Sequence, residues 1–366
     1  MTSLPSDLPK ASGNTPGYVS AYKTCLRIES ALETELSNDG TEKKDARVRQ
    51  SETHLVYIRI LGYLLHFIPS RTGLDCLARE IEECTSDDDL LQLGQMYCDQ
   101  FLRPFKSNRG GRSSTSSSSS TSPISRPSFR TLDDMVTEYL EDAPESHFTA
   151  RKKALVRDGF RCLVSGVYDH LMLKNNRELS TKFYAQTPQP ERTITKCAHI
   201  FPEPMNRDGP LRMEEREHDY ALWAIMNRFG YSEIQDELKG ANIHLLENVM
   251  TLRLELCIAF ESMDIWFVAT QDKPNEYWVR TAFPELIPNY ADTLVTFEAS
   301  RPDLPVPSPL YLAVHAACAQ VGWLSGATDM IERLEMKMEE GLVLSPSGDS
   351  AELLNHALRG LKVAGY

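Results

Sequence analysis

Residues 156–166 read VRDGFRCLVSG, and this is the first of three short stretches on which the interpretation of the sequence rests. Two shorter stretches follow it, CAHIFP at residues 197–202 and NVMTL at residues 248–252. Together they place a histidine, an asparagine and two cysteines between predicted strands and helices. Imidazole is the side chain whose ordinary pKa lies nearest to neutral pH, so it can take up or release a proton under physiological conditions. These stretches are therefore the candidates for a functional site.

Short strands among helices are predicted around these stretches. Aromatic and β-branched residues favour strands, whereas apolar residues at i, i+3 and i+4 favour helices. Strands are predicted at residues 160–164, 194–201, 264–270, 277–283 and 295–299, and helices at residues 214–229, 251–263 and 310–324. In the helix over 251–263, Leu252, Leu256 and Phe260 share one face. The chain is therefore predicted to be α+β and mostly helical.

Composition divides the chain into five parts. The most distinct is a Ser-rich stretch at 107–128 that cannot bury apolar surface, which predicts a linker. The predicted parts are a disordered tail at 1–20, a helical segment at 21–106 in which Pro104 stops the last helix, the linker at 107–128, a module at 129–300, and a C-terminal helical segment at 301–366. No internal repeat is visible.

The length, net charge and cysteine content of the chain restrict the class of protein. The chain has 366 residues, a net charge of -13 and eight cysteines, none in a C-x-x-C pair. Scattered cysteines are typical of a reducing compartment, so an intracellular protein is expected, with nucleus and cytoplasm both open. The most apolar run, residues 55–68, is too short to cross a bilayer and predicts a buried helix; no membrane partner is expected. The acidic balance argues against broad non-specific nucleic-acid binding.

In order and spacing, the three stretches resemble the HNH nuclease family, in the branch frequent in fungal proteins. That branch reads RDG-aromatic-RC, then AHI-x-P, then N-x-x-x-L with a histidine nine residues after the Asn and FD shortly beyond. The run PVPSPLYLAVHAACAQVGWLSGA at 305–327 is similar to the helical tail of that branch. The resemblance therefore covers at least residues 150–327.

The resemblance implies a ββα-metal module, with strand additions and helical flanks, that binds one divalent cation, Zn²⁺ or Mg²⁺. It implies that His199 is the general base and that Asn248 orients the loop that holds it. Cys257 stands where the family has its metal-binding His, and Glu261 takes the family's acidic position. The implied function is a metal-dependent phosphodiester hydrolase that acts on DNA. Protein partners are not indicated.

Cys257 is the main departure from the family pattern, and it leaves two functions open. A thiolate prefers softer metals than Mg²⁺, and a buried thiol keeps its proton. The first function is an HNH endonuclease with a makeshift site at Cys257 and Glu261. The alternative is a catalytically inactive HNH-fold module for interaction or regulation. A buried core cysteine is favoured over a metal ligand at this position.

Two further features leave alternatives open. His170, His218 and His244 are spare candidates for the missing ligand. His244 lies four residues before Asn248, and an exposed loop histidine is the favoured interpretation there. The basic residues Arg151, Lys152, Lys153, Arg157 and Arg161 form a cluster at the start of the module. They would contact phosphates or, equally, form a solvated helix face.

Overall fold

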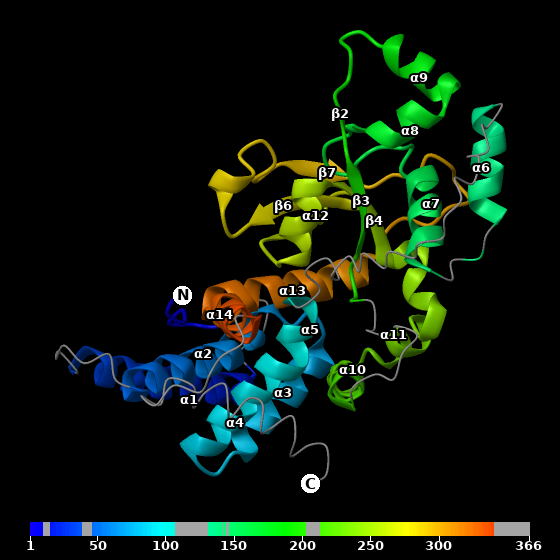
Figure 1. Cartoon of the computed structure of the whole chain (residues 1–366). Coiled ribbons are helices and arrows are strands. Elements are labelled where there is room, and N and C mark those ends of the chain that lie inside the picture. The colour runs from blue at the N-terminus through cyan, green and yellow to red at the C-terminus, as the bar shows by residue number, and fades with distance from the viewer. Residues whose placement is uncertain are drawn as a thin grey trace. The chain divides into compact units, whose positions relative to one another are not determined.

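The computed structural model describes residues 1–9, 15–38, 46–106, 131–141, 143, 146–202 and 213–339 (Figure 1). The described residues are mostly helical with small sheets, so the α+β expectation is confirmed. The expected linker at 107–128 and the last part of the C-terminal helical segment lie outside them. No helix among these residues combines the length and the apolar character needed to cross a bilayer.

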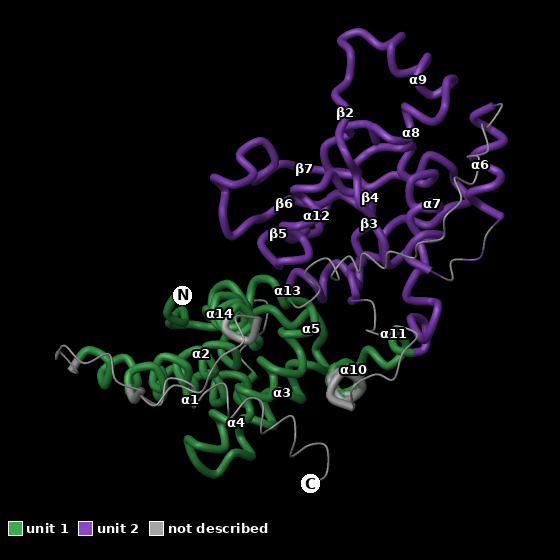
Figure 2. The backbone as a smooth tube through the Cα atoms, in the orientation of Figure 1, with its two compact units in different colours: residues 1–106, 204–235, 317–366 green, residues 107–203, 236–316 purple. Residues whose placement is uncertain are grey.

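The chain forms two compact units that differ from the expected division (Figure 2). Unit 1 contains residues 1–106, 204–235 and 317–366, and unit 2 contains residues 107–203 and 236–316. The expected module at 129–300 is therefore interrupted by a stretch that belongs to unit 1. The long apolar helix over 309–325 spans the boundary at residue 317.

Unit 1 is a bundle of helices. Its elements are α1 (Pro16–Asn38), α2 (Ala46–Phe67), α3 (Arg71–Glu83), α4 (Asp87–Tyr97), the π-helix η2 (Cys98–Leu102), α5 (Arg103–Lys106), α10 (Met213–Arg228), most of α11 (Ser232–Glu237), the second part of α13 (Pro309–Ser325) and α14 (Ala327–Glu339). A capping box of Ser86 and Asp89 begins α4. Helices α2 and α4 approach closely because Gly94 has no side chain; a Cβ there would lie 2.4 Å from the Tyr57 carbonyl oxygen.

Two expectations for this unit are wrong. Pro104 does not stop the helix, because the π-helix η2 precedes it and Pro104 then lies in the first turn of α5. Proline is tolerated in a first turn, since its missing N–H would have no helical partner there. Residues 1–20 are not a disordered tail throughout, because α1 begins at Pro16 and Leu4 is buried.

Unit 2 combines three small sheets with helices. Its helical elements are α6 (Leu132–Glu141), α7 (His147–Arg157), α8 (His170–Asn175), α9 (Arg177–Tyr184), η3 (Gly240–His244), η4 (Leu246–Asn248), α12 (Leu254–Glu261), η5 (Pro284–Leu286) and the start of α13 (Pro309–Ser325). Its strands are β1 (Tyr168–Asp169), β2 (Arg192–Thr193), β3 (Thr195–His199), β4 (Val249–Arg253), β5 (Ile265–Ala269), β6 (Glu276–Thr281) and β7 (Leu294–Thr296). Strands β3 and β4 form an antiparallel pair, and β5, β6 and β7 form an antiparallel sheet.

The strand predicted at 160–164 is wrong. Gly159 and Phe160 have φ values of 62° and 60°, and Gly166 has 66°, so the chain turns tightly here. These positive φ values lie in the left-handed region, which interrupts an extended backbone. What remains of the expected strand is one isolated bridge between Arg161 and Tyr168.

The helix predicted over 251–263 begins later than expected. Residues 249–253 form β4, and α12 starts at Leu254. Val249, Met250, Thr251 and Leu252 are all buried, because both faces of this strand are covered. A continuous apolar run of this kind has no period that distinguishes a buried strand from a buried helix.

Candidate functional site

Strands β3 and β4 and helix α12 form the centre of the candidate site. The two strands pair antiparallel, with His199 opposite Val249 and Thr195 opposite Arg253, and α12 follows β4 directly. Helix α7 packs against both strands, and α12 packs against β3 and β4 (Figure 1). Ala150 and Ala154 of α7 allow this close packing, since small side chains let the helix approach Cys197 of β3.

A buried ion pair joins the end of α7 to β4. Arg157 and Asp158 both have fully buried side chains, with 2.6 Å between Nε and Oδ1 and 3.0 Å between Nη2 and Oδ2. Arg157 also donates to the carbonyl oxygens of Leu246 and Val249, and Asp158 accepts from the Thr251 N–H at 3.0 Å. Charges can be buried at tolerable cost when paired and hydrogen-bonded in this way. The Arg-Asp-Gly stretch therefore positions β4.

The basic residues at the start of the module are mostly engaged within the protein. Arg157 is buried, so contact with phosphate is wrong for this residue. Arg151 donates to the Thr195 carbonyl oxygen at 2.7 Å and pairs with the buried Asp169 at 3.3 Å. Arg161 lies over the Tyr168 ring, 4.0 Å from its centroid, and Lys152 lies over Phe148 at 4.9 Å.

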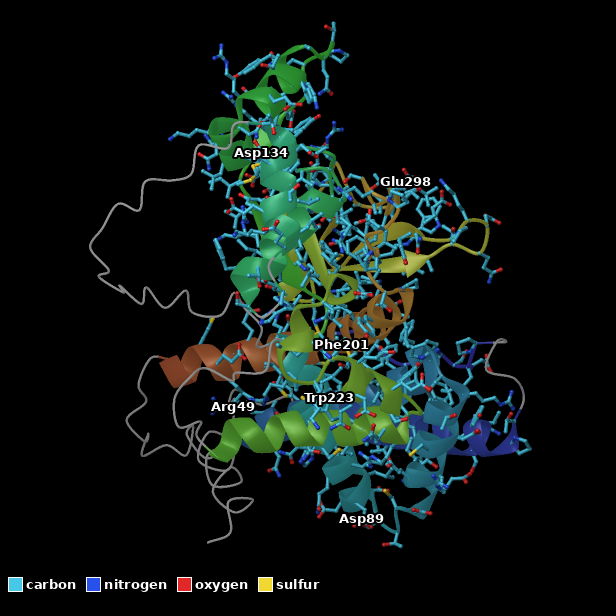
Figure 3. All side chains as sticks on the ribbon, turned by 90° about the vertical axis from the view of Figure 1, so that its right-hand side faces the viewer. Arg49, Asp89, Asp134, Phe201, Trp223 and Glu298 are labelled. Atoms are coloured by element: carbon cyan, nitrogen blue, oxygen red, sulfur yellow. The ribbon has the colours of Figure 1, made fainter. Side chains whose placement is uncertain are left out.

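Asn248 is fully buried and ties two loops together. Its Oδ1 accepts from the Phe201 N–H at 2.8 Å, and its Nδ2 donates to the carbonyl oxygens of Phe201, at 3.2 Å, and Ile243, at 2.9 Å. Its own carbonyl accepts from the Ile200 N–H at 2.8 Å. Phe201, labelled in Figure 3, lies on the loop that leaves β3 two residues after His199. The Asn248 amide thus fixes the loops that carry His199 and His244.

His199 lies at the end of β3 among two other imidazoles. It is 5% exposed, and its Nε2 lies 3.0 Å from Nδ1 of His244, which is 6% exposed. The His147 ring, at the first residue of α7, lies 5.3 Å from it between centroids. Burial, together with the charges that His147 and His244 would carry, lowers the pKa of His199 to about 3. We name residues 147, 199 and 244 the imidazole cluster.

The imidazole cluster was only partly predictable. His244 is buried against His199, so the interpretation as an exposed loop histidine is wrong; its spacing from Asn248 was the available signal. His147 was missed, because it lies 52 positions before His199 and outside every motif.

Cys257 and Glu261 lie on α12, one helical turn apart. The buried Cys257 thiol donates to Glu261 Oε1 across 3.4 Å. Burial first, and the Glu261 carboxylate second, raise the pKa of the Cys257 thiol far above its usual range, so the thiol is protonated at neutral pH. The structure therefore brings the strand end that carries His199 together with Asn248, and Cys257 together with Glu261.

The residues present do not fit the divalent cation that the resemblance implies. Within the described part of the chain, no three His, Cys, Asp or Glu side chains are arranged to hold a metal ion. A cysteine binds a metal as the thiolate, and a histidine binds it through a free lone pair of the neutral imidazole. Here the Cys257 proton is held by Glu261, and the His199 Nε2 faces His244.

Comparison of the chain with protein-family models, with curated proteins and with solved structures gives no match.

Proposed function

We propose that unit 2 carries a module of HNH descent that has lost its cation site and serves as a protein-interaction or regulatory module instead of cutting nucleic acid. The order β3, β4, α12 supports the descent, since the family has two strands followed by a helix. His199 and Asn248 at one end of the strand pair support it as well. The proposal of HNH descent rests on this order of elements, on the positions of His199 and Asn248, and on the three sequence stretches.

The contact between Cys257 and Glu261 carries the proposal for function. A carboxylate 3.4 Å from a buried thiol stabilises the protonated thiol, and a protonated thiol is not a metal ligand. His199 adds to this, because a histidine whose pKa is lowered to about 3 is a weak general base at neutral pH.

Charge favours a protein partner over a nucleic acid. The chain has a net charge of -13, and Arg151, Arg157 and Arg161 are engaged by side chains or carbonyl groups of unit 2. Binding to a nucleic acid draws on Lys and Arg side chains that are available to neutralise phosphates. We therefore expect weak binding of duplex DNA at physiological salt.

The test uses the full chain with supercoiled plasmid and Mg²⁺, Mn²⁺, Zn²⁺ or Ni²⁺, together with metal titration by calorimetry. The expected result is no nicking and no stoichiometric metal. Cys257→His is expected to raise metal affinity at least tenfold, because an imidazole binds metal without losing a proton from a raised pKa. Cys84→His, at a partly exposed cysteine directly after α3, is the matched control and should leave the affinity unchanged.

The second candidate is a metal-dependent phosphodiester hydrolase acting on DNA. The three sequence stretches favour it, because in order and spacing they resemble those of the HNH nucleases. Nicking by the wild-type chain that His199→Ala abolishes would establish this candidate and overturn the first. Nicking that persists in His199→Ala would point to a contaminating nuclease.

A further inference from the structure

The first residues of the chain bind to unit 1 through their backbone. The Thr2 N–H donates to the Leu324 carbonyl oxygen at 2.8 Å, and the Tyr63 hydroxyl lies 3.1 Å and 2.8 Å from the carbonyl oxygens of Thr2 and Ser3. The Leu4 N–H donates to both carboxylate oxygens of Glu29, at 3.0 and 3.2 Å. Tyr22 donates to the Pro5 carbonyl oxygen at 2.6 Å. Each residue from Thr2 to Pro5 is thus held through its own main-chain N–H or carbonyl group.

One side chain of this segment is buried in a pocket of matching shape. Leu4 is 7% exposed, whereas Thr2, Ser3 and Pro5 are exposed. The pocket exists because α2 has a glycine at position 62, and a Cβ there would lie 2.5 Å from Leu4 Cδ1. A glycine inside a helix weakens that helix. Its presence at this position matches the space that Leu4 needs.

Charged side chains on α1 and α2 complete the surface. Arg59 pairs with Glu29 and with Glu33, at 2.6 Å in each case, and both Arg59 and Glu29 are buried. The Ser3 hydroxyl donates to Glu33 at 2.8 Å and accepts from Arg59 at 3.0 Å. This network therefore recognises a hydroxyl side chain directly before the leucine.

We infer that this surface of unit 1 is a recognition site for an extended peptide of the type Thr-Ser-Leu-Pro, which residues 2–5 of the chain occupy in cis. Main-chain hydrogen bonds together with one apolar anchor are the usual means by which a protein binds an extended peptide. Proline fits the fourth position because its contact uses only the carbonyl oxygen. A segment with one buried side chain opens at little cost in apolar area, so the same sequence on another protein competes for the site.

The test uses the full chain with a protease recognition sequence in place of residues 10–14, cleaved after folding. A fluorescent peptide with the sequence of residues 1–9 is then added, and its binding is followed by anisotropy. We expect saturable binding, at least tenfold weaker for the peptide with Leu4→Asp and unchanged for Ser6→Ala, an exposed position. In the protein, Gly62→Ala should weaken binding at least tenfold, whereas Gly17→Ala should not, because a Cβ at Gly17 meets no atom closer than 3.9 Å.

Absence of saturable binding, or equal binding of the Leu4→Asp peptide, would overturn the inference. Should the cleaved protein unfold when it releases the segment, hydrogen exchange of the Leu4 amide in the uncut chain decides instead. A recognition site predicts that this amide exchanges at least tenfold faster than the most protected amides of α2. Equal protection would make residues 2–5 a permanent part of the core and refute the site.

Discussion

His199 Nε2 lies 3.0 Å from His244 Nδ1, and both rings are buried. At this distance one nitrogen donates a hydrogen and the other accepts it. A proton added to His199 would be poorly solvated and would also face the rings of His244 and His147. The imidazole cluster is therefore a place where acid destabilises the folded state.

Acid is expected to destabilise the protein partly through His199. Its pKa is lowered to about 3 in the folded state from an ordinary value of 6.5, so between these values the unfolded chain binds a proton that the folded chain does not. The free energy of unfolding is therefore unaffected by the titration of His199 above about pH 6.5. As the pH falls from 6.5 towards 3, His199 lowers this free energy by up to roughly 1.4 kcal/mol per pH unit. His66 and His315, whose pKa values are each lowered to about 4 by burial, act in the same direction.

Urea unfolding at pH 7 and pH 5 measures this effect. His199→Asn should reduce the loss of unfolding free energy between the two pH values, because its side chain does not titrate. Asn242→Ala, at an exposed position of η3, removes no titratable group; it is the control and should keep the wild-type difference in unfolding free energy between the two pH values. If His199→Asn loses as much unfolding free energy between pH 7 and pH 5 as the wild-type chain does, the acid effect does not come from the imidazole cluster.

Asn248→Ala is expected to lower the free energy of unfolding by about 3 kcal/mol. The variant removes three side-chain hydrogen bonds and leaves the Phe201 N–H without its acceptor, and an unsatisfied buried donor costs about 1–3 kcal/mol. Chemical denaturation measures the change. Asn242→Ala, at an exposed position of η3, should change the free energy of unfolding little. A similar decrease in both variants would show that the hydrogen bonds of the Asn248 side chain do not stabilise the fold.

Arg157→Met is expected to destabilise the chain by about 3–5 kcal/mol, because it leaves the Asp158 carboxylate buried without its partner. Arg301→Met breaks an exposed pair with Asp303 and should leave the unfolding midpoint unchanged. A phosphate-binding Arg157 would give the reverse pattern, with little effect on unfolding and weaker binding of DNA.

Iodoacetamide at pH 7.5 should modify Cys84 first. Cys84 is partly exposed, whereas the other seven cysteines are buried. We expect Cys257 to react at least tenfold more slowly than Cys84, because burial and Glu261 keep its thiol protonated. Mass spectrometry of time points assigns each site. Rapid modification of Cys257 in the folded chain would mean that its thiolate is available, as the hydrolase candidate requires.

The sequence was informative where one local signal determines the structure. The glycine at 230 marks the end of α10, and the aromatic runs on either side of residues 271–275 predict the hairpin of β5 and β6. His199 is the last residue of β3 and Asn248 directly precedes β4, so the second and third stretches meet at one end of this strand pair.

The features that could not be predicted from the sequence depend on contacts between residues that are distant in the chain. Nothing local distinguishes a buried Arg157 from a solvated one, since its acceptors lie at Leu246 and Val249. His147 joins His199 only after α7 has packed on the strands. The β-conformation of residues 249–253 likewise requires β3 as a partner, and an isolated apolar run does not specify one.

Unit 1 is assembled from stretches separated by most of unit 2. Helix α14 packs on α2 and α5, and Lys106 on α5 pairs with Glu332 on α14 at 3.5 Å. During synthesis the ribosome therefore releases both stretches of unit 2 before α14 has been made. The faces of α2 and α5 that α14 covers stay without this partner on the nascent chain until then, and exposed apolar surface of this kind favours aggregation.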